Sequence, residues 1–346
     1  MSLPAALRDQ AGHCDALGSP FMARLLTLLA KRLRPDGPVT ERLFHWQGDL
    51  SPQGHSVPLR LCGALHALKL QDATGPLAQV YPPNTATDDQ LWDAITQAFT
   101  THETFLMAFL DSPPQTNEVR RSAAILPALL TALDHFDLPV TLPTTLSELG
   151  ASAGLNLHPD RYALNINGHT LGAADPALTL SPAWTGPLPP RASIQIANRA
   201  GVDLNPLTGP DDPARLRAYL WPDQPERLTL TNAALALPTP DIARADAADW
   251  LATRLATPHK GLHFLFHTIA WQYFPAPVQA RCTDIIQGAA ARATPKATLA
   301  WFAMENDAGK GGKGAALTLR LWPGDLTLAL GRADFHGRWI DWHHKG

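Results

Sequence analysis

The strongest constraint on the fold is the stretch of residues 145–157, in which small side chains recur at every second position. An apolar run leads to the acidic residue Glu148, and Gly150, Ser152 and Gly154 follow it. Small residues let the backbone bend tightly and let a ligand approach main-chain N–H groups. Partial positive charge collects on such groups where a helix begins. The pattern predicts the end of a buried strand, a Gly-rich bend and the start of a helix.

After this bend, short apolar runs alternate with helical patterns, which is the order expected of a parallel sheet with crossover helices. The clearest strand is residues 262–270, a nearly continuous aromatic and aliphatic run of the kind that is buried on both faces. Further strands are predicted at 194–206 (as one strand or two pieces), 241–247 and 297–304, and a helix is predicted over 275–292.

The alternating part contains one excursion and ends in a different pattern. Asn167 and Gly168 separate two short apolar runs, which predicts a hairpin, and a Pro-rich stretch closes the excursion. Residues 315–342 alternate between apolar and polar side chains and contain Pro-Gly and His-Gly turns. This end of the chain is predicted to be a meander of antiparallel strands.

The first third of the chain is helical in pattern. The clearest helix follows Thr87, where Gln90 completes a capping-box pattern three residues later. Its apolar stripe continues to Phe109, and an Asp-Ser-Pro-Pro sequence then stops it. We predict a helical N-terminal domain or cap over residues 1–112 and an α/β domain over residues 113–346.

Composition argues against several classes of function. The formal net charge is −3 and the basic residues are scattered, so a nucleic-acid surface is not expected. The longest nearly apolar run, 123–133, is interrupted by Pro127 and is shorter than the ~20 residues of a membrane span. Three cysteines without a Cys-x-x-Cys pair fit neither a disulfide framework nor a zinc site, and the histidines are dispersed. We expect a cytoplasmic protein that does not act on nucleic acid or membranes and holds no metal.

Residues 148–157 resemble the first motif of S-adenosylmethionine-dependent methyltransferases with a Rossmann-like fold, which runs acid-x-Gly-x-Gly-x-Gly. Ser152 stands at the position of the middle glycine. The resemblance covers roughly residues 115–346 and implies a mostly parallel sheet with antiparallel C-terminal strands. Residues 115–120, 148–157 and 199–206 also resemble a bacterial family of undetermined function, whose members look like methyltransferases.

The resemblance implies a site for S-adenosylmethionine beyond the carboxyl ends of the strands, where open α/β sheets bind ligands. Glu148 ends the first strand, Asp203 looks like the acid that binds ribose hydroxyls, and Asp246 looks like the acid that meets the adenine amine. A carboxylate suits a ribose diol because it accepts two O–H bonds at once. The long separation of Gly154 from Asp203 implies an insertion around residues 160–192. The expected cofactor-binding residues are Glu148, Gly150, Ser152, Gly154, Asn156, Asp203, Asp246 and Ala247.

Polar and aromatic residues follow two later strands, where methyltransferases place residues for substrate and catalysis. His267 is the expected general base, Trp271 an expected platform for a flat or cationic group, and Glu305 a second polar group. The alternative is that His267 is a hydrogen-bonded core histidine and that the aromatic residues only pack. The expected substrate-binding residues, with one Arg pairing a carboxylate or phosphate, are Asn117, Arg120, Arg121 and Tyr273.

These residues lead to the hypothesis of a methyltransferase that acts on a small molecule, with alignment and water exclusion supplying most of the rate. An NAD-dependent oxidoreductase is one alternative, although the bend lacks the third glycine of Gly-x-Gly-x-x-Gly. A non-catalytic binding protein that retains the fold is another. The Gly/Lys-rich residues 309–314 lack the arrangement of a phosphate loop and are expected to form a lid or a plain loop.

Overall fold

The computed structural model describes residues 1–139, 141–310 and 312–345. The chain forms two compact units. The first combines Met1–Thr116 with Gly209–Thr229, and the second combines Asn117–Thr208 with the residues from Leu230 onward. The polypeptide therefore passes between the units three times, at 116/117, 208/209 and 229/230.

Helices build the first unit. Their bounds are α1 (Leu3–Ala16), α2 (Pro20–Arg32), α3 (Pro38–Phe44), α4 (Val57–Gln71), α5 (Pro76–Val80), α6 (Asp88–Thr101), α7 (Glu103–Leu110), α9 (Asp212–Ala218) and the first part of α10 (Pro225–Leu235). Within the described ranges of the whole chain, none of the helices is both long and apolar enough to cross a membrane.

Helix α6 begins where the capping pattern predicts. The hydroxyl of Thr87 accepts the N–H of Gln90 at 3.2 Å, and the side-chain oxygen of Gln90 accepts the N–H of Thr87 at 2.9 Å. Two donors that a helix start leaves unpaired are thereby satisfied. The single helix expected from the apolar stripe is divided at His102, between α6 and α7. The hydroxyl of Thr101 donates to the carbonyl of Gln97 at 2.8 Å within the last turn of α6.

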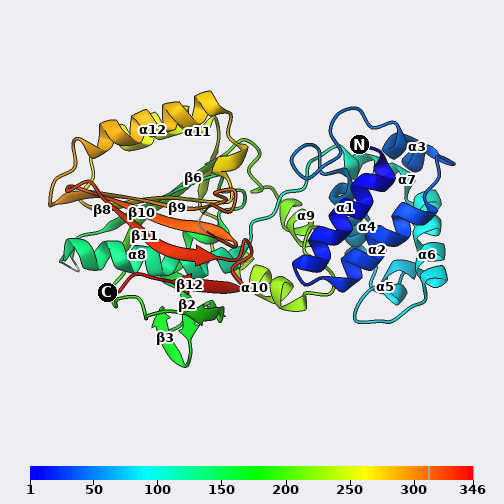
Figure 1. Ribbon diagram of the computed structural model, residues 1–346, viewed down its shortest axis with the longest axis horizontal. Helices are drawn as coiled ribbons and strands as arrows, with labels where there is room; N and C mark the ends of the chain where they lie inside the picture. The colour runs from blue at the N-terminus through cyan, green and yellow to red at the C-terminus, as the bar shows by residue number, and fades with distance from the viewer. Residues whose placement is uncertain (140, 311, 346) are drawn as a thin grey trace. The chain divides into compact units, whose positions relative to one another are not determined.

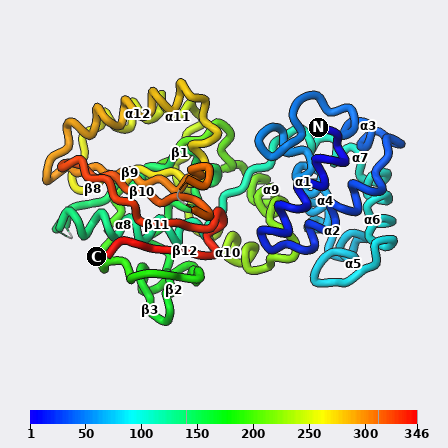
Figure 2. The backbone as a smooth tube through the Cα atoms, viewed as in Figure 1, coloured from blue at the N-terminus to red at the C-terminus, as the bar shows by residue number. Residues whose placement is uncertain are grey.

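The segment Gly209–Thr229 completes the core of the first unit, and Figure 2 shows its tube returning to the helices formed by the start of the chain. Tyr219 and Trp221 belong to the same buried cluster as the leucines of α1, α2 and α4. Asp223 accepts the hydroxyl proton of Ser19 at 2.5 Å. The first unit is therefore built from two separate stretches of sequence.

A sheet that has nine strands in the described residues is the frame of the second unit, in the order β5-β12-β11-β10-β9-β8-β1-β6-β7. The bounds are β1 (Thr144–Leu149), β5 (Ala183–Thr185), β6 (Ile196–Asp203), β7 (Asp241–Arg244), β8 (Gly261–Thr268), β9 (Ala297–Glu305), β10 (Ala315–Trp322), β11 (Leu326–Ala333) and β12 (Trp339–Trp342). Strands β7, β6, β1, β8 and β9 run parallel, whereas β10, β11 and β12 pair antiparallel. The predicted α/β class, with a mostly parallel sheet and antiparallel C-terminal strands, is confirmed.

Helices cover both faces of this sheet (Figure 1). On one face lie α11 (Ala247–Ala256) and α12 (Ala276–Ala290), where Leu251 shares a buried cluster with Leu265 of β8. On the other face α8 (Ser122–Phe136) packs against β8, β9 and β10. Successive side chains of a strand point to opposite faces, so each strand contributes to both layers.

The bend after β1 does not begin an α-helix, so this prediction is wrong. The chain continues into two 3₁₀ turns, Leu155–Leu157 and Pro159–Arg161. Pro159 has no N–H to donate to the carbonyl of Leu155 four residues earlier, which weakens any helix started here.

The excursion that follows forms a small second sheet. In the described residues it has three strands, ordered β3-β2-β4, with bounds β2 (Tyr162–Ile166), β3 (His169–Gly172) and β4 (Leu178–Leu180). The predicted hairpin is confirmed, because β2 and β3 are antiparallel and are joined by Asn167 and Gly168 at φ 49° and 88°.

Strand β1 lies where the order of the main sheet changes direction. The chain passes from β1 to β6 and β7 on one side and then returns to β8 and β9 on the other. Open α/β sheets bind ligands beyond the carboxyl ends of the strands at such a switch point. The ends of β1 at Leu149 and of β8 at Thr268 therefore mark the candidate ligand site.

A polar network ties α11 to the middle of the sheet. The guanidinium of Arg254 donates to the hydroxyl of Ser147 at 2.9 Å and to the carbonyl of Leu146 at 3.0 Å. Nε2 of His263 lies 2.8 Å from the same hydroxyl. Burial lowers the pKa of His263 to about 3, with help from His259 and Arg254, so the ring that contacts Ser147 is neutral.

Arg254→Met should lower the free energy of unfolding by about 2 kcal/mol, because a buried hydroxyl and a carbonyl lose a charged donor. Urea denaturation measures the change. Arg281→Met on α12 is the matched control: Arg281 pairs with Asp249 on the surface, so a much smaller loss is expected. Equal losses for the two variants would contradict the role of the network.

Candidate functional site

Three residues of the bend after β1 have left-handed backbone. Gly150, Ser152 and Gly154 adopt φ values of 72°, 52° and 72°. Glycine tolerates this conformation, whereas a residue with a Cβ loses roughly 1–2 kcal/mol. The small residues therefore alternate because every second residue of the bend has left-handed backbone. Ser152 is the one of the three that has a Cβ, so the backbone strain is at Ser152.

The last two residues of β6 hold this bend. The carbonyl of Val202 accepts the N–H groups of Gly150 and Ala151 at 2.9 and 3.0 Å. Oδ2 of Asp203 accepts the N–H of Ser152 at 2.9 Å. Asp203 thus positions the bend, and any contact that it makes with a ligand is additional.

Further contacts come from the segment around the start of α8. Oδ1 of Asn117 accepts the N–H of Leu155 at 2.7 Å, and Oδ1 of Asn156 accepts the hydroxyl proton of Ser122 at 2.7 Å. Both asparagines are buried. One was expected to bind substrate and the other the cofactor, and the structure brings both to the bend.

Protein atoms lie close to both glycines of the bend. A Cβ on Gly150 would lie 2.6 Å from Cβ of Ala270, and one on Gly154 would lie 2.9 Å from Cδ1 of Ile242. Real Cβ atoms do not approach other atoms so closely. The glycines therefore serve the packing of the bend against its neighbours, whatever they do for a ligand.

Glu148 is buried at the end of β1, with 1% of its surface exposed. Its neighbours Ser147 and Leu149 face α11, so Glu148 lies on the α8 face. Burial raises the pKa of Glu148 well above its ordinary value; Arg121 and a hydrogen bond with Asn156 oppose this shift, and Asp203 adds to it. The neutral carboxyl group is therefore favoured.

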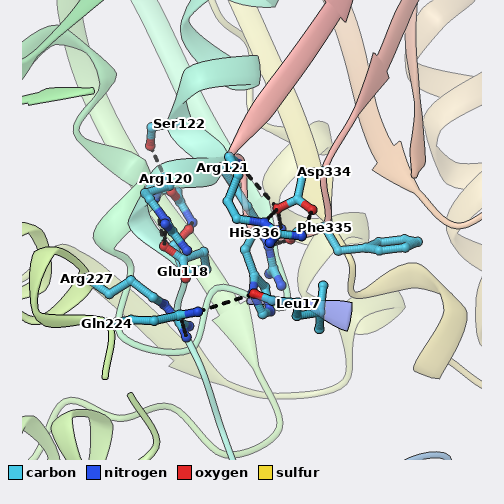
Figure 3. A network of polar contacts seen from close by, with 12 residues as sticks. Leu17, Glu118, Arg120, Arg121, Ser122, Gln224, Arg227, Asp334, Phe335 and His336 are labelled. Carbon is cyan, nitrogen blue, oxygen red and sulfur yellow. Dashed lines mark hydrogen bonds and ion pairs between the residues drawn. The ribbon is translucent and has the colours of Figure 1, made fainter. Parts of the chain in front are cut away.

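Two arginines that were expected to bind substrate have protein partners (Figure 3). Nε of Arg121 donates to the carbonyl of Phe335 at 3.0 Å, and Nη1 donates to that of Thr268 at 3.1 Å. Nε of Arg120 lies 3.1 Å from Oε1 of Glu118. Arg121 thereby joins the end of β8 to the segment after β11, and a role for either arginine toward substrate stays a prediction.

Asp246 caps helix α11. Its Oδ1 accepts the N–H groups of Ala248 and Asp249 at 2.9 and 3.2 Å, and Ala247 beside it is buried. Such a cap is worth about 1 kcal/mol to a helix. Asp246 also follows β7, so Glu148, Asp203 and Asp246 lie at or just beyond the ends of three neighbouring strands.

The three expected catalytic residues come together at the ends of β8 and β9. Nδ1 of His267 lies 2.7 Å from Oε1 of Glu305, which also accepts the N–H groups of Ala270 and Trp271 at 3.0 and 3.1 Å. Burial alone would raise the pKa of Glu305, but these hydrogen bonds outweigh it and hold the pKa below its ordinary value. The indole of Trp271 stacks on the imidazole with ring centroids 4.8 Å apart and planes 20° apart.

Ile269 connects β8 to this pair through an unusual backbone conformation. Its φ is 50°, which a β-branched residue rarely adopts. Its N–H still donates to the carbonyl of Met304 at 2.9 Å, as in the pairing of β8 with β9. The next two N–H groups, of Ala270 and Trp271, donate to Glu305 instead. The sequence contains no signal for this turn, because glycine or asparagine would be expected at a left-handed position.

Two large apolar side chains near these strand ends are exposed. Leu204 is 65% exposed directly after Asp203, and Tyr273 is 63% exposed at the end of the 3₁₀ turn Trp271–Tyr273. An apolar surface beside a carboxylate suits a flat ligand with polar substituents. Leu204 was not among the expected residues, although its place between Asp203 and Asn205 in the sequence was a signal.

Some of the buried polar atoms that lack a hydrogen-bond partner lie near the ends of β1, β8 and β9, and others lie elsewhere in both units. Among the described residues they include Oε2 of Glu148, Oγ of Ser152, Nε2 of His267 and Oε2 of Glu305. Each such atom costs about 1–3 kcal/mol, and native proteins contain few. Glu148 lies on the α8 face and the His267–Glu305 pair on the α11 face, with the bend between them. These atoms are candidates for contacts with a polar ligand.

The Gly/Lys-rich segment joins β9 to β10. Arg332 donates to the carbonyls of Gly312 and Gly314 and pairs with Asp307 at 2.9 Å. Gly311 lies outside the described residues. The interpretation as a lid or a plain loop stays a prediction.

A family model described as "Uncharacterized protein conserved in bacteria (DUF2332)" matches residues 4–342. The chain therefore belongs to this bacterial family, which confirms the expectation of a bacterial family of undetermined function. No curated protein and no solved structure gives a significant match. The resemblance to methyltransferases stays a prediction.

Ser152→Gly should raise the free energy of unfolding of the free protein by about 1–2 kcal/mol. It relieves a left-handed non-glycine residue and removes a buried unpaired hydroxyl, and these gains exceed the entropy cost of glycine. Thermal and urea denaturation measure the change. Gly150→Ala, the matched control, should destabilise, because its Cβ meets Ala270. If Ser152→Gly lowered the free energy of unfolding, the inference that Ser152 is strained would be wrong.

Glu148→Gln should change how stability depends on pH. In the unfolded chain Glu148 ionises above its ordinary pKa of 4.5, whereas the raised pKa keeps it protonated in the folded protein, so wild-type stability falls as pH rises above that value. The variant does not titrate. The stability difference should be constant below about pH 4 and should shift in favour of the variant between about pH 5 and 8. Urea denaturation of both proteins across this pH range measures the stability difference. A difference that stays constant between about pH 5 and 8 would contradict the prediction.

Proposed function

We propose that the protein binds S-adenosylmethionine at the carboxyl ends of β1, β6 and β7 and transfers its methyl group to a small-molecule acceptor. The proposal rests on the position of Glu148, Asp203 and Asp246 at the ends of three neighbouring parallel strands, beside the switch point. Open α/β sheets bind ligands there. The resemblance of residues 148–157 to the first methyltransferase motif agrees with this placement.

The side chains around the bend fit the polar parts of such a cofactor. Oγ of Ser152 and the carboxyl group of Glu148 offer buried, unpaired atoms to an amino-acid moiety. The carboxylate of Asp203 suits a ribose diol, and the exposed side chain of Leu204 suits the face of a purine. Asp246 can accept the exocyclic amine while it caps α11.

Recognition through this bend would differ from the original expectation in one respect. The N–H groups of Gly150, Ala151 and Ser152 already donate to acceptors on β6. A ligand would therefore be held mainly by side chains, and the main chain of the bend would serve to position them.

When bound, the sulfonium supplies an electrophilic methyl group whose bonding electron pair leaves with sulfur. The contribution of the protein would be to align the acceptor and exclude water. Trp271 and Tyr273 offer aromatic surface for a flat or cationic acceptor. The scattered basic residues favour a small acceptor over nucleic acid, and the free thiols of Cys14, Cys62 and Cys282 agree with a cytoplasmic location.

Calorimetric titration tests the cofactor assignment. The wild-type protein should bind S-adenosylhomocysteine and S-adenosylmethionine but not NAD. Asp203→Asn should weaken the binding of S-adenosylhomocysteine at least about tenfold, because hydrogen bonds to a charged acceptor are worth about 1.5–3 kcal/mol each. Asn retains one oxygen for the N–H of Ser152, so the bend keeps that bond, while the N–H of Asn205 loses its bond of 2.8 Å to Oδ1.

Asp241→Asn is the matched control, because Asp241 is exposed at the opposite end of the neighbouring strand β7. It should leave the affinity unchanged. Binding of NAD alone would refute the proposal in favour of an oxidoreductase, and binding of none of the three would favour a non-catalytic protein.

A further inference from the structure

The hydrogen bonds around Glu305 determine which nitrogen of His267 carries the proton. Oε1 accepts two main-chain N–H groups as well as the contact from Nδ1, and these bonds favour the ionised carboxylate. A carboxylate only accepts, so Nδ1 must donate. The neutral ring then has its lone pair on Nε2, which is buried and unpaired among the described residues.

The direction of Nε2 follows from the order of the strands. Nδ1 points to Glu305 on β9, and Nε2 lies on the far side of the ring from Nδ1. The other neighbour of β8 is β1, whose end begins the bend. The lone pair is therefore directed away from Glu305.

The surroundings hold the imidazole in this orientation. Trp271 stacks on one face of the ring, and Trp301 lies with its ring centroid 6.0 Å away. The left-handed backbone of Ile269 turns the N–H groups of Ala270 and Trp271 onto the carboxylate. Strained residues of this kind persist where the surrounding structure demands them and are concentrated at functional sites.

We infer that His267 is the general base of this site, that Glu305 is its positioning residue, and that the acceptor reacts through a hydroxyl or amine group that gives up a proton. This inference rests on the proposed function. The O–H or N–H bond of the acceptor breaks, its electron pair stays on the nucleophile, and the proton forms a bond to Nε2. Glu305 offsets the charge of the imidazolium. Acceptors without a removable proton, such as thioethers and tertiary amines, do not need this pair.

Nitrogen-15 NMR of the histidine side chains tests the arrangement without any ligand. At a pH where the ring is neutral, His267 should show a protonated Nδ1 and an unprotonated Nε2. Glu305→Leu removes the acceptor that fixes this form and should shift the ring toward the other tautomer. A proton on Nε2 in the wild-type protein would overturn the inference.

Turnover tests the chemistry. Release of S-adenosylhomocysteine is measured with a panel of phenols, alcohols, primary amines, thioethers and tertiary amines. The wild-type protein should methylate members of the first three classes. His267→Gln should lower kcat about 100-fold or more, the usual contribution of a general base, while KM and the calorimetric Kd for S-adenosylhomocysteine stay within about threefold.

His263→Gln is the matched control. His263 is on the same strand and face as His267 and equally buried, but its Nε2 is engaged by Ser147. It should leave kcat unchanged. Wild-type rates for His267→Gln, or turnover restricted to thioethers and tertiary amines, would overturn the inference. Failure of the wild-type protein to bind S-adenosylhomocysteine would refute the proposed function, while the NMR result would still report on the pair.

Discussion

The joint between the ends of β1 and β6 is the constraint on which the edge of the sheet depends. Val202 and Asp203 together accept three consecutive N–H groups of the bend. Because the bend is fixed there, Glu148 stays buried on one side of it and Ala270 packs against Gly150 on the other. The segment after β8, which carries Ala270, then lies where its N–H groups reach Glu305. One carboxylate and one carbonyl thus determine the positions of groups on four strands.

The bend after β1 and the segment after β8 are less stable locally than their burial suggests. Ser152 and Ile269 hold left-handed conformations without being glycine, and several buried polar atoms lack partners. Each feature costs about 1–3 kcal/mol and the rest of the unit must offset it. The offset comes from features such as the cluster under α11 and α12 and the stacked aromatic residues of β8 and β9. Proteins usually accept such local conflicts where they bind or react with something.

Local patterns in the sequence predicted local structure well. The capping box at Thr87 and the hairpin at Asn167 and Gly168 depend on residues within four positions of each other, and both are present. The long apolar run of β8 and the alternation near the C-terminus likewise predicted strands that the structure contains. The bend was predicted from its small residues, and the left-handed backbone at every second residue explains the spacing of these residues.

Non-local contacts could not be predicted in the same way. The helix expected after the bend is replaced by 3₁₀ turns, and Asn117, which accepts the N–H of Leu155, lies 38 positions earlier in the chain. The parallel pairing of β5 with β12 joins residues far apart in the chain. The pairing of His267 with Glu305 depends on the register of β8 and β9, and the left-handed Ile269 has no signature in its residue type.

The return of Gly209–Thr229 to the first unit has a consequence for how such a protein can be inherited. The carbonyl of Ala218 accepts the hydrogen bond from Nδ1 of His66, so residues 1–116 alone would leave a buried imidazole unpaired and a core open. Because the helical unit consists of two separate stretches of sequence, a single gene fusion cannot add it and a single deletion cannot remove it. Gain or loss of either unit would need coordinated changes at three points of the gene, and descent as one indivisible piece is the simplest history.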